Sequence, residues 1–361
     1  MFVSIIALAL SALSITASAE DAAPTTVTLT LAGVGQGIVG VIQPANSDAT
    51  ALQNVAVPTA QTWHFSPQQA GAQFGLKVEH GSFFAVVDSS AMFGGLGQTT
   101  NGMPVLQTLN STLGGTVRSW TLSLQGGLFA NQRGFEPVLP GSVSQQWFVM
   151  HATPTYEWSY WNFGAEFVAA HSSGNAFVLG YSSTWDGVVR LKPPEQQPTV
   201  YGGVRIARDW GSVAAHVTAA PTLGHYDADT AGEVYVSTTT TLRWQGNAGY
   251  NPGQSATECG FLAARVGGPV RGFKKFSGAL RVDGCGEQLV GANSVPTLLD
   301  AAGDSTNLYR VAGTANLTAE PWEGVQFGVE GTGGVVTGNQ PFWGVSGVVT
   351  VSGAFQTTLP H

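Results

Sequence analysis

The sequence predicts an all-β protein, specifically a closed antiparallel transmembrane β-barrel of roughly 12–16 strands that follows a cleaved signal peptide. Three observations predict this fold. Apolar and polar residues alternate along most of the chain, an apolar export segment opens it, and charged residues make up only 10% of its 361 residues. A typical soluble domain has about 25% charged residues, so this chain lacks the charged surface that keeps such domains in solution.

The first element is the export segment, residues 1–19. Its apolar core runs from Phe2 to Leu13, and Ala17-Ser18-Ala19 has the small residues of a signal-peptidase site. No lysine or arginine precedes the apolar core. Either the free amino terminus supplies the positive charge expected there, or the natural start lies upstream. We expect a signal peptide at residues 1–19 and one barrel domain at residues 20–361.

The stretch 199–220 shows the alternation most clearly. Its first half places apolar residues opposite Tyr201 and Arg205, and its second half places them opposite His216. Side chains point to opposite faces at successive positions of a strand, so a period of two indicates β-structure. The break at Asp209-Trp210-Gly211 predicts a hairpin turn. The polar face holds mostly small residues, which is typical of a lumen and unlike a soluble surface.

The same pattern continues along the chain. Further strands are predicted at residues 72–79, 156–160, 163–169, 234–244, 262–266, 275–282, 309–317, 325–330 and 343–355, with a first strand near Val27. No charge falls on the apolar face of these segments, and a one-residue slip would break that rule everywhere. Counting back from the C-terminus leaves two alternatives: either a strand within 221–256 is unrecognised, or the turn at 208–211 lies on the long-loop side.

Connections and aromatic residues favour a membrane-spanning barrel. Tight turns are predicted at 161–162, 208–211, 267–270 and 319–324, and long loops at 88–115 and 284–306. Short turns at one rim and long loops at the other are typical of outer-membrane barrels. Five tryptophans near strand ends suggest interfacial girdles, although scattered core tryptophans are the alternative: Trp161, Trp210, Trp244, Trp322 and Trp343.

Two sequence stretches carry a family resemblance. The last strand, FWGVSGVVTVSGAF, resembles the C-terminal assembly signal of bacterial outer-membrane β-barrel proteins, although residues 356–361 follow its final phenylalanine. The stretch PTVYGGVRIARDWGSVAAHVTAA resembles a segment of α-proteobacterial porins. The resemblance implies residence in the cell outer membrane among its lipids, insertion by the barrel-assembly machinery, and passive diffusion of small hydrophilic solutes. The resemblance is also compatible with a homo-oligomer.

The charges on the polar faces give the candidate site. The predicted pore-lining residues are Arg205, Arg243, Arg265, Lys275, Arg281, Arg310, Glu79, Glu157, Glu166 and Glu330. The basic residues fall within 199–318 and the acidic ones before or after, so a basic and an acidic wall would face one another. Charged walls set ion selectivity at short range, which suggests a mild anion preference. The alternative is that ion pairs plug a narrow lumen.

The two cysteines, Cys259 and Cys285, predict a disulfide. Exported proteins with an even cysteine count favour disulfides. The midpoint of the pair is residue 272, close to the break at 267–269, so the cysteines would face each other across one hairpin. Two unrelated thiols are the alternative.

Other chemistry has weak support in the sequence, which predicts neither an enzyme nor a bound cofactor or metal. The net charge of −8 argues against a nucleic-acid partner. The segment His225 to Asp229 offers oxygen ligands for a divalent cation, but an ordinary solvated loop is the simpler interpretation. His171 lies two residues from Ser173, as a lipase dyad would, yet no orienting group or oxyanion donor accompanies it.

The main rival is a secreted or surface-attached all-β protein without a pore, such as an adhesin or a carbohydrate-binding sandwich. Such a protein would share the signal peptide, the disulfide and the alternating strands. It would be expected to carry a higher surface charge, because 36 charged residues in 361 protect a soluble particle poorly from association.

Overall fold

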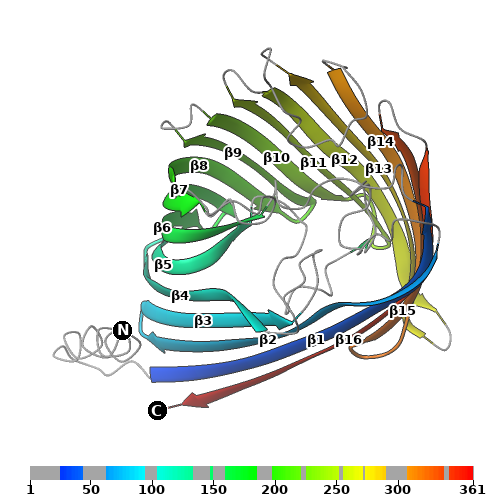
Figure 1. Ribbon diagram of the computed structural model, residues 1–361. Coiled ribbons are helices and arrows are strands. Elements are labelled where there is room, and N and C mark those ends of the chain that lie inside the picture. Colours follow the sequence, from blue (N-terminus) through cyan, green and yellow to red (C-terminus); the bar gives the residue numbers. More distant parts are fainter. Residues whose placement is uncertain are drawn as a thin grey trace.

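The computed structural model describes residues 25–43, 62–93, 104–132, 147–148, 159–184, 197–220, 225–251, 255–270, 273–289, 307–336 and 341–360. The strands form a closed antiparallel barrel (Figure 1) in which each pairs with its neighbours in the chain and β1 closes on β16. The strands are β1 (Thr25–Gln43), β2 (Thr62–His80), β3 (Phe83–Phe93), β4 (Pro104–Val117), β5 (Trp120–Gln132), β6 (Ser159–His171), β7 (Asn175–Thr184), β8 (Gln197–Arg208), β9 (Gly211–Ala220), β10 (His225–Tyr235), β11 (Thr240–Asn251), β12 (Ser255–Val270), β13 (Phe273–Leu289), β14 (Asn307–Trp322), β15 (Val325–Val336) and β16 (Phe342–Pro360). The predicted all-β closed barrel is therefore confirmed, at the upper end of the predicted strand number.

The two faces of the wall differ as the alternation predicts. On β13, Leu280 and Val282 are 65% and 61% exposed, whereas Arg281 and Asp283 between and beside them are 2% exposed. Large apolar side chains are exposed in the same way on strands all around the barrel. A closed barrel with an apolar exterior is the arrangement that satisfies every backbone group within lipid. Within the described residues, no helix is long and apolar enough to cross a membrane.

Exposed aromatic side chains form a belt near each rim of the barrel. Near the short turns lie Phe83, Trp210 and Trp322, and near the opposite rim lie Tyr181, Tyr226, Tyr309 and Trp343. Aromatic belts near the two rims are typical of outer-membrane barrels. Trp210, Trp322 and Trp343 thus lie near strand ends as predicted.

The structure resolves the alternatives left open by the strand count. β10 is the unrecognised strand within 221–256, and residues 236–239 form a turn where the sequence predicted the start of one strand over 234–244. The turn at Asp209-Trp210 therefore lies at the same rim as the other short turns. Gly324, in the β14–β15 turn, has a φ of 75°, and a Cβ there would lie 2.0 Å from the Ser352 carbonyl oxygen.

Other predicted boundaries were wrong. Residues 161–162 lie inside β6 and form no turn. Residues 88–115, predicted as a long loop, include the end of β3 and most of β4, and β13 extends to Leu289 within the second predicted loop. Glycine, serine and asparagine favour loops in general, but here they occupy strand positions at which a polar lumen face tolerates them. The predicted signal peptide, residues 1–19, lies outside the described residues.

Candidate functional site

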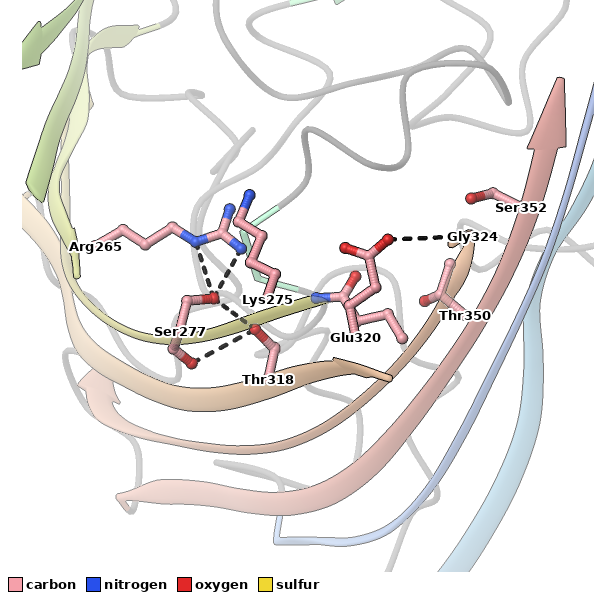
Figure 2. A pocket seen from close by; sticks show the side chains of 9 residues that line it. Arg265, Lys275, Ser277, Thr318, Glu320, Gly324, Thr350 and Ser352 are labelled. Atoms are coloured by element: carbon pink, nitrogen blue, oxygen red, sulfur yellow. Dashed lines mark hydrogen bonds between the residues drawn. The ribbon is translucent and has the colours of Figure 1, made fainter. Parts of the chain in front are cut away.

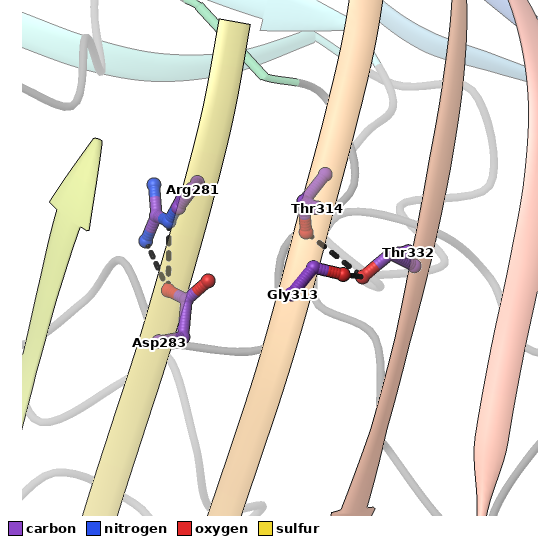
Figure 3. Close-up of polar contacts among 5 residues, drawn as sticks. All are labelled: Arg281, Asp283, Gly313, Thr314 and Thr332. Carbon is purple, nitrogen blue, oxygen red and sulfur yellow. Dashed lines mark hydrogen bonds and ion pairs between the residues drawn. The ribbon is translucent and has the colours of Figure 1, made fainter. Parts of the chain in front are cut away.

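The candidate site is the inner face of the wall, where charged side chains concentrate on β9–β14. Glu233 of β10 accepts a hydrogen bond from Arg243 Nε of β11. Figure 3 shows a second pair, in which Arg281 Nε and Nη2 each lie 2.7 Å from Asp283 Oδ1. Charges withdrawn this far from water need partners, because desolvation disfavours an isolated ion.

A third contact of this inner face joins His216 to Asp229. His216 Nδ1 lies 3.0 Å from Asp229 Oδ1, and both side chains are 1% exposed. The sequence placed His216 on the inner face, and its burial agrees with that. Residues 225–229, interpreted from the sequence as a solvated loop, are instead the first part of β10, with Asp227 and Asp229 buried on the inner face. Among the described residues, no group of three acidic, histidine or cysteine side chains could hold a metal ion.

Trp147 and Phe148, which belong to the chain between β5 and β6, contact this charged part of the wall. The Trp147 ring centroid lies 4.1 Å from Arg243 Cζ and 5.7 Å from Arg265 Cζ, and the Trp147 carbonyl accepts a hydrogen bond from Asn316 Nδ2. Cations over an indole face are attracted to its electron-rich ring. The segment is therefore fixed to the lumen side of β11–β14 by polar and cation–π contacts together.

Phe148 adds an apolar contact at the same place. It is 2% exposed and packs with Phe261, Ala263 and Ala279, which face inward from β12 and β13. Arg281 Cζ lies 3.9 Å from the centroid of the Phe261 ring. An apolar patch on an otherwise polar lumen face gives the phenylalanine a specific docking position. We call Trp147 and Phe148 the aromatic latch.

Nine of the ten predicted pore-lining residues lie on described strands, and Glu157 lies outside them. Glu166 of β6 is buried and accepts a hydrogen bond of 2.9 Å from Tyr201 of β8. Glu330 of β15 accepts one of 3.3 Å from Asn316. Glu79 of β2 pairs with Lys77 at 2.7 Å. These acidic residues are thus each held by a neighbour on the inner face.

The predicted basic residues are spread over adjacent strands. Arg205 lies on β8 on the face of Tyr201, and Arg310 lies on β14 opposite Cys285 in register. Arg243, Arg265, Lys275 and Arg281 occupy β11, β12 and β13. The structure brings these four together and leaves Arg205 apart. Glu233 and Asp283 lie among them, so this part of the wall has mixed charge and is not purely basic.

Cys259 and Cys285 are direct partners in the β12–β13 register. Their backbone positions therefore match the predicted cross-hairpin arrangement, although their side chains lie outside the described part of the structure. Opposed residues of antiparallel strands have Cα atoms about 4.5–5.5 Å apart, within the range a disulfide spans. The pairing of the two thiols stays a prediction.

The histidine–serine dyad that resembles a lipase site lies in the β6–β7 turn. His171 Nδ1 is 2.7 Å from Ser173 Oγ and also accepts the Ser173 backbone N–H at 3.1 Å. Arg208 Nη1 donates to the Ser173 carbonyl oxygen at 2.5 Å, and Trp120 packs edge-on against the His171 ring. These contacts explain the short distance between His171 and Ser173 as part of a hydrogen-bonded turn.

Sequence reasoning missed three parts of the site: Glu233, Asp283 and the aromatic latch. Glu233 lies on β10, the strand that the sequence pattern did not identify. Asp283 continues the alternation of its strand by one step beyond Val282, so extending that strand would have found it. The aromatic latch gave no such signal. Two adjacent aromatic residues form no alternating pattern, and their partners lie about a hundred residues or more further along the chain.

The fold and the inner face together define a transmembrane barrel of the outer-membrane type with a polar lumen. No protein-family model matches the sequence, and no curated protein matches it. Solved structures do. An anion-selective porin from Comamonas acidovorans is 10% identical, with a TM-score of 0.59 over 91% of this chain and 100% of that one.

Two further solved structures show the same similarity. OmpF of Salmonella typhi is 10% identical, with a TM-score of 0.56 over 91% of this chain and 97% of its own. The outer-membrane channel DcaP of Acinetobacter baumannii is 10% identical, with a TM-score of 0.52 over 91% and 97% of the two chains. This chain therefore has the fold of the bacterial outer-membrane porins, as its sequence resemblance implied.

Proposed function

We propose that this protein is an outer-membrane channel through which small hydrophilic solutes diffuse passively, with a mild preference for anions. The observation that carries the proposal is the barrel itself, closed by sixteen strands, apolar outside and polar inside. A barrel of about 8 strands is filled by its own side chains, whereas 16–18 strands enclose an aqueous channel. An adhesin-type sandwich would not close on itself or expose apolar side chains all around.

The anion preference rests on an imbalance among the inner charges of β11–β13. Arg243 and Arg281 are paired with carboxylates, whereas Arg265 donates its hydrogen bonds to the Ser277 hydroxyl. Lys275 lies on the same inner face. Positive charge without a matched carboxylate raises the local concentration of anions in a low-dielectric channel.

The aromatic latch gives the channel a narrow point. Trp147 and Phe148 are fixed against the inner face of β11–β14, so they occupy cross-section that solutes would otherwise use. Arg243 and Arg265 lie directly beside the Trp147 ring. We therefore propose that solutes meet the cationic side chains at the place where the channel is narrowest.

The remaining expectations belong to the same proposal. Residues 1–19 would be removed on export, the barrel-assembly machinery would insert the chain, and Cys259 would be oxidised with Cys285. Homo-oligomers fit an outer-membrane channel of this fold, and no catalytic role is proposed for the His171–Ser173 turn.

Planar-bilayer recording of refolded protein tests the function. We expect discrete conductance steps, a reversal potential shifted towards anions under a salt gradient, and larger steps for Trp147→Ala because the variant removes an indole ring from the narrow point. Trp210→Ala is the matched control, because Trp210 lies in an exposed turn. Pure refolded protein that gives no steps contradicts the channel.

A further inference from the structure

A small recess lies on the inner face near the short-turn rim, between β12 and β16 (Figure 2). Its volume is about 50 Å³, and its walls carry two cations, Arg265 and Lys275, together with several hydroxyl groups. The short turns of outer-membrane barrels face the periplasm. Under the proposed function, on which this location rests, the recess is at the periplasmic end of the channel.

The guanidinium of Arg265 is held in place without a carboxylate. Its Nε and Nη2 donate to Ser277 Oγ at 3.1 Å and 2.8 Å, and Ser277 Oγ lies 2.7 Å from Thr318 Oγ1. A hydroxyl group orients the guanidinium without neutralising it, and the carboxylates of Glu320 and Glu233 attract Arg265 without a hydrogen bond to it. The remaining donors of Arg265 are therefore available to an anion.

The ammonium of Lys275 lies beside this guanidinium in Figure 2, and the two cations repel each other. No described residue hydrogen-bonds Lys275 Nζ. Glu320 is its register partner on β14, and Glu320 Oε1 accepts the Gly324 N–H at 3.3 Å. Two cations against one carboxylate leave the recess with a net charge of about +1 at neutral pH.

The size of the recess limits what it can hold. One buried water needs about 10–15 Å³ of accessible volume, so the recess has room for about three to five waters. A carboxylate group of a small organic acid fits that space. Gln326 of β15 and the hydroxyls of Thr350 and Ser352 on β16 complete the lining. They offer donors and acceptors for hydroxyl groups next to the carboxylate.

We propose that this recess binds the carboxylate of a small hydroxylated organic acid at the periplasmic end of the channel. The carboxylate lies between Arg265 and Lys275, and the hydroxyl groups of the acid reach the β15–β16 side. The site would hold a passing anion next to the narrow point, because Arg265 borders both the recess and the Trp147 ring.

Isothermal titration of the detergent-folded protein with sodium gluconate tests the proposal. We expect saturable binding that Lys275→Gln weakens about tenfold or more, because one charge-assisted hydrogen bond is lost. Lys275→Arg should retain most of the affinity. Lys274→Gln is the matched control, since Lys274 is the next residue on β13 and pairs with the exposed Glu323. Its affinity should equal that of the unaltered protein.

Two results overturn the site: no saturable gluconate binding by the unaltered protein, or equal weakening by Lys274→Gln and Lys275→Gln. Acetate should bind more weakly than gluconate, and equal affinities would refute the role of the hydroxyl groups. The titration needs no conduction, so channel steps without gluconate binding remove the site and leave the channel function. Gluconate binding without channel steps would leave the binding site and remove the channel function.

Discussion

Two ion pairs of equal length lie on the inner face of this barrel, one on β2 and one on β13, and they differ in exposure. Lys77 Nζ and Glu79 Oε1 on β2 are 2.7 Å apart, with side chains 43% and 44% exposed. Arg281 Nη2 and Asp283 Oδ1 on β13 are also 2.7 Å apart, with side chains 1% and 2% exposed. Exposed pairs contribute little to stability, whereas breaking a buried pair leaves a charge that water no longer solvates.

The surroundings of the two pairs differ in the same way. Near β2, the inner face is joined by hydroxyl contacts, such as Ser90 to Thr108 at 2.7 Å. Around β13, the aromatic latch covers the wall, and Phe148 packs beside Ala279. The latch therefore accounts for part of the burial on the β13 side, and the buried charges in turn fix the position of the latch. The β2 side has no comparable contact among the described residues.

The largest predicted effect comes from breaking the buried pair. Arg281→Met should lower the free energy of unfolding by about 3–5 kcal/mol, because Asp283 is left charged and buried. Lys77→Met should lower it by about 0–1 kcal/mol. Urea unfolding in lipid vesicles, followed by tryptophan fluorescence, measures both.

A double variant separates charge from packing in this comparison. Arg281→Met combined with Asp283→Leu removes both charges and should recover much of the lost stability. If Arg281→Met and Lys77→Met lowered the free energy of unfolding equally, burial would not explain a difference in stability between the two pairs.

The sequence predicted the faces of the barrel well because a lipid-facing wall obeys a strict period of two. It failed at β10, whose outward face carries small residues such as Ala228 and Gly232. Trp244 of β11 supplies the missing apolar cover: a Cβ on Gly232 would lie 1.8 Å from its ring. The apolar surface of this strand is thus provided by its neighbour, which an alternation pattern within one segment cannot show.

The candidate site was less predictable for a related reason. Positions such as Arg243 and Arg281 follow from the alternation, because their strand face decides that they point inward. Their partners do not follow, since the contacts to Glu233 and Trp147 depend on strand register and on a segment outside the wall.

The second predicted effect concerns the β12–β13 hairpin, where Cys259 opposes Cys285. If the disulfide forms, Cys285→Ser should lower the free energy of unfolding by about 2–4 kcal/mol. Such a loss would mean that β12 and β13, the hairpin that carries the buried Arg281–Asp283 pair, are also joined by a covalent bond. Alkylation of the unfolded protein without reductant, followed by mass measurement, should label neither cysteine, and labelling of both would contradict the disulfide.

The smallest predicted effect comes from an exposed pair at the short-turn rim, between the start of β13 and the β14–β15 turn. Lys274 Nζ lies 2.8 Å from Glu323 Oε2, and their side chains are 57% and 89% exposed. The hydrogen bond from Lys274 and its positive charge lower the pKa of the Glu323 carboxyl below its ordinary value of 4.5. A lowered carboxyl pKa stabilises the folded state above the ordinary value, and that stabilisation is lost as the pH falls through the lowered pKa.

Water and salt screen a pair this exposed, so the contribution should be near the limit of detection. Glu323→Gln should therefore change the urea midpoint less than Lys77→Met does, and any change at pH 7 should disappear in 1 M salt. Comparing the midpoints of Glu323→Gln and the unaltered protein at pH 7 and pH 3 measures the pH dependence. A large, salt-resistant loss of stability at pH 7 would show that exposure does not rank the ion pairs of this barrel.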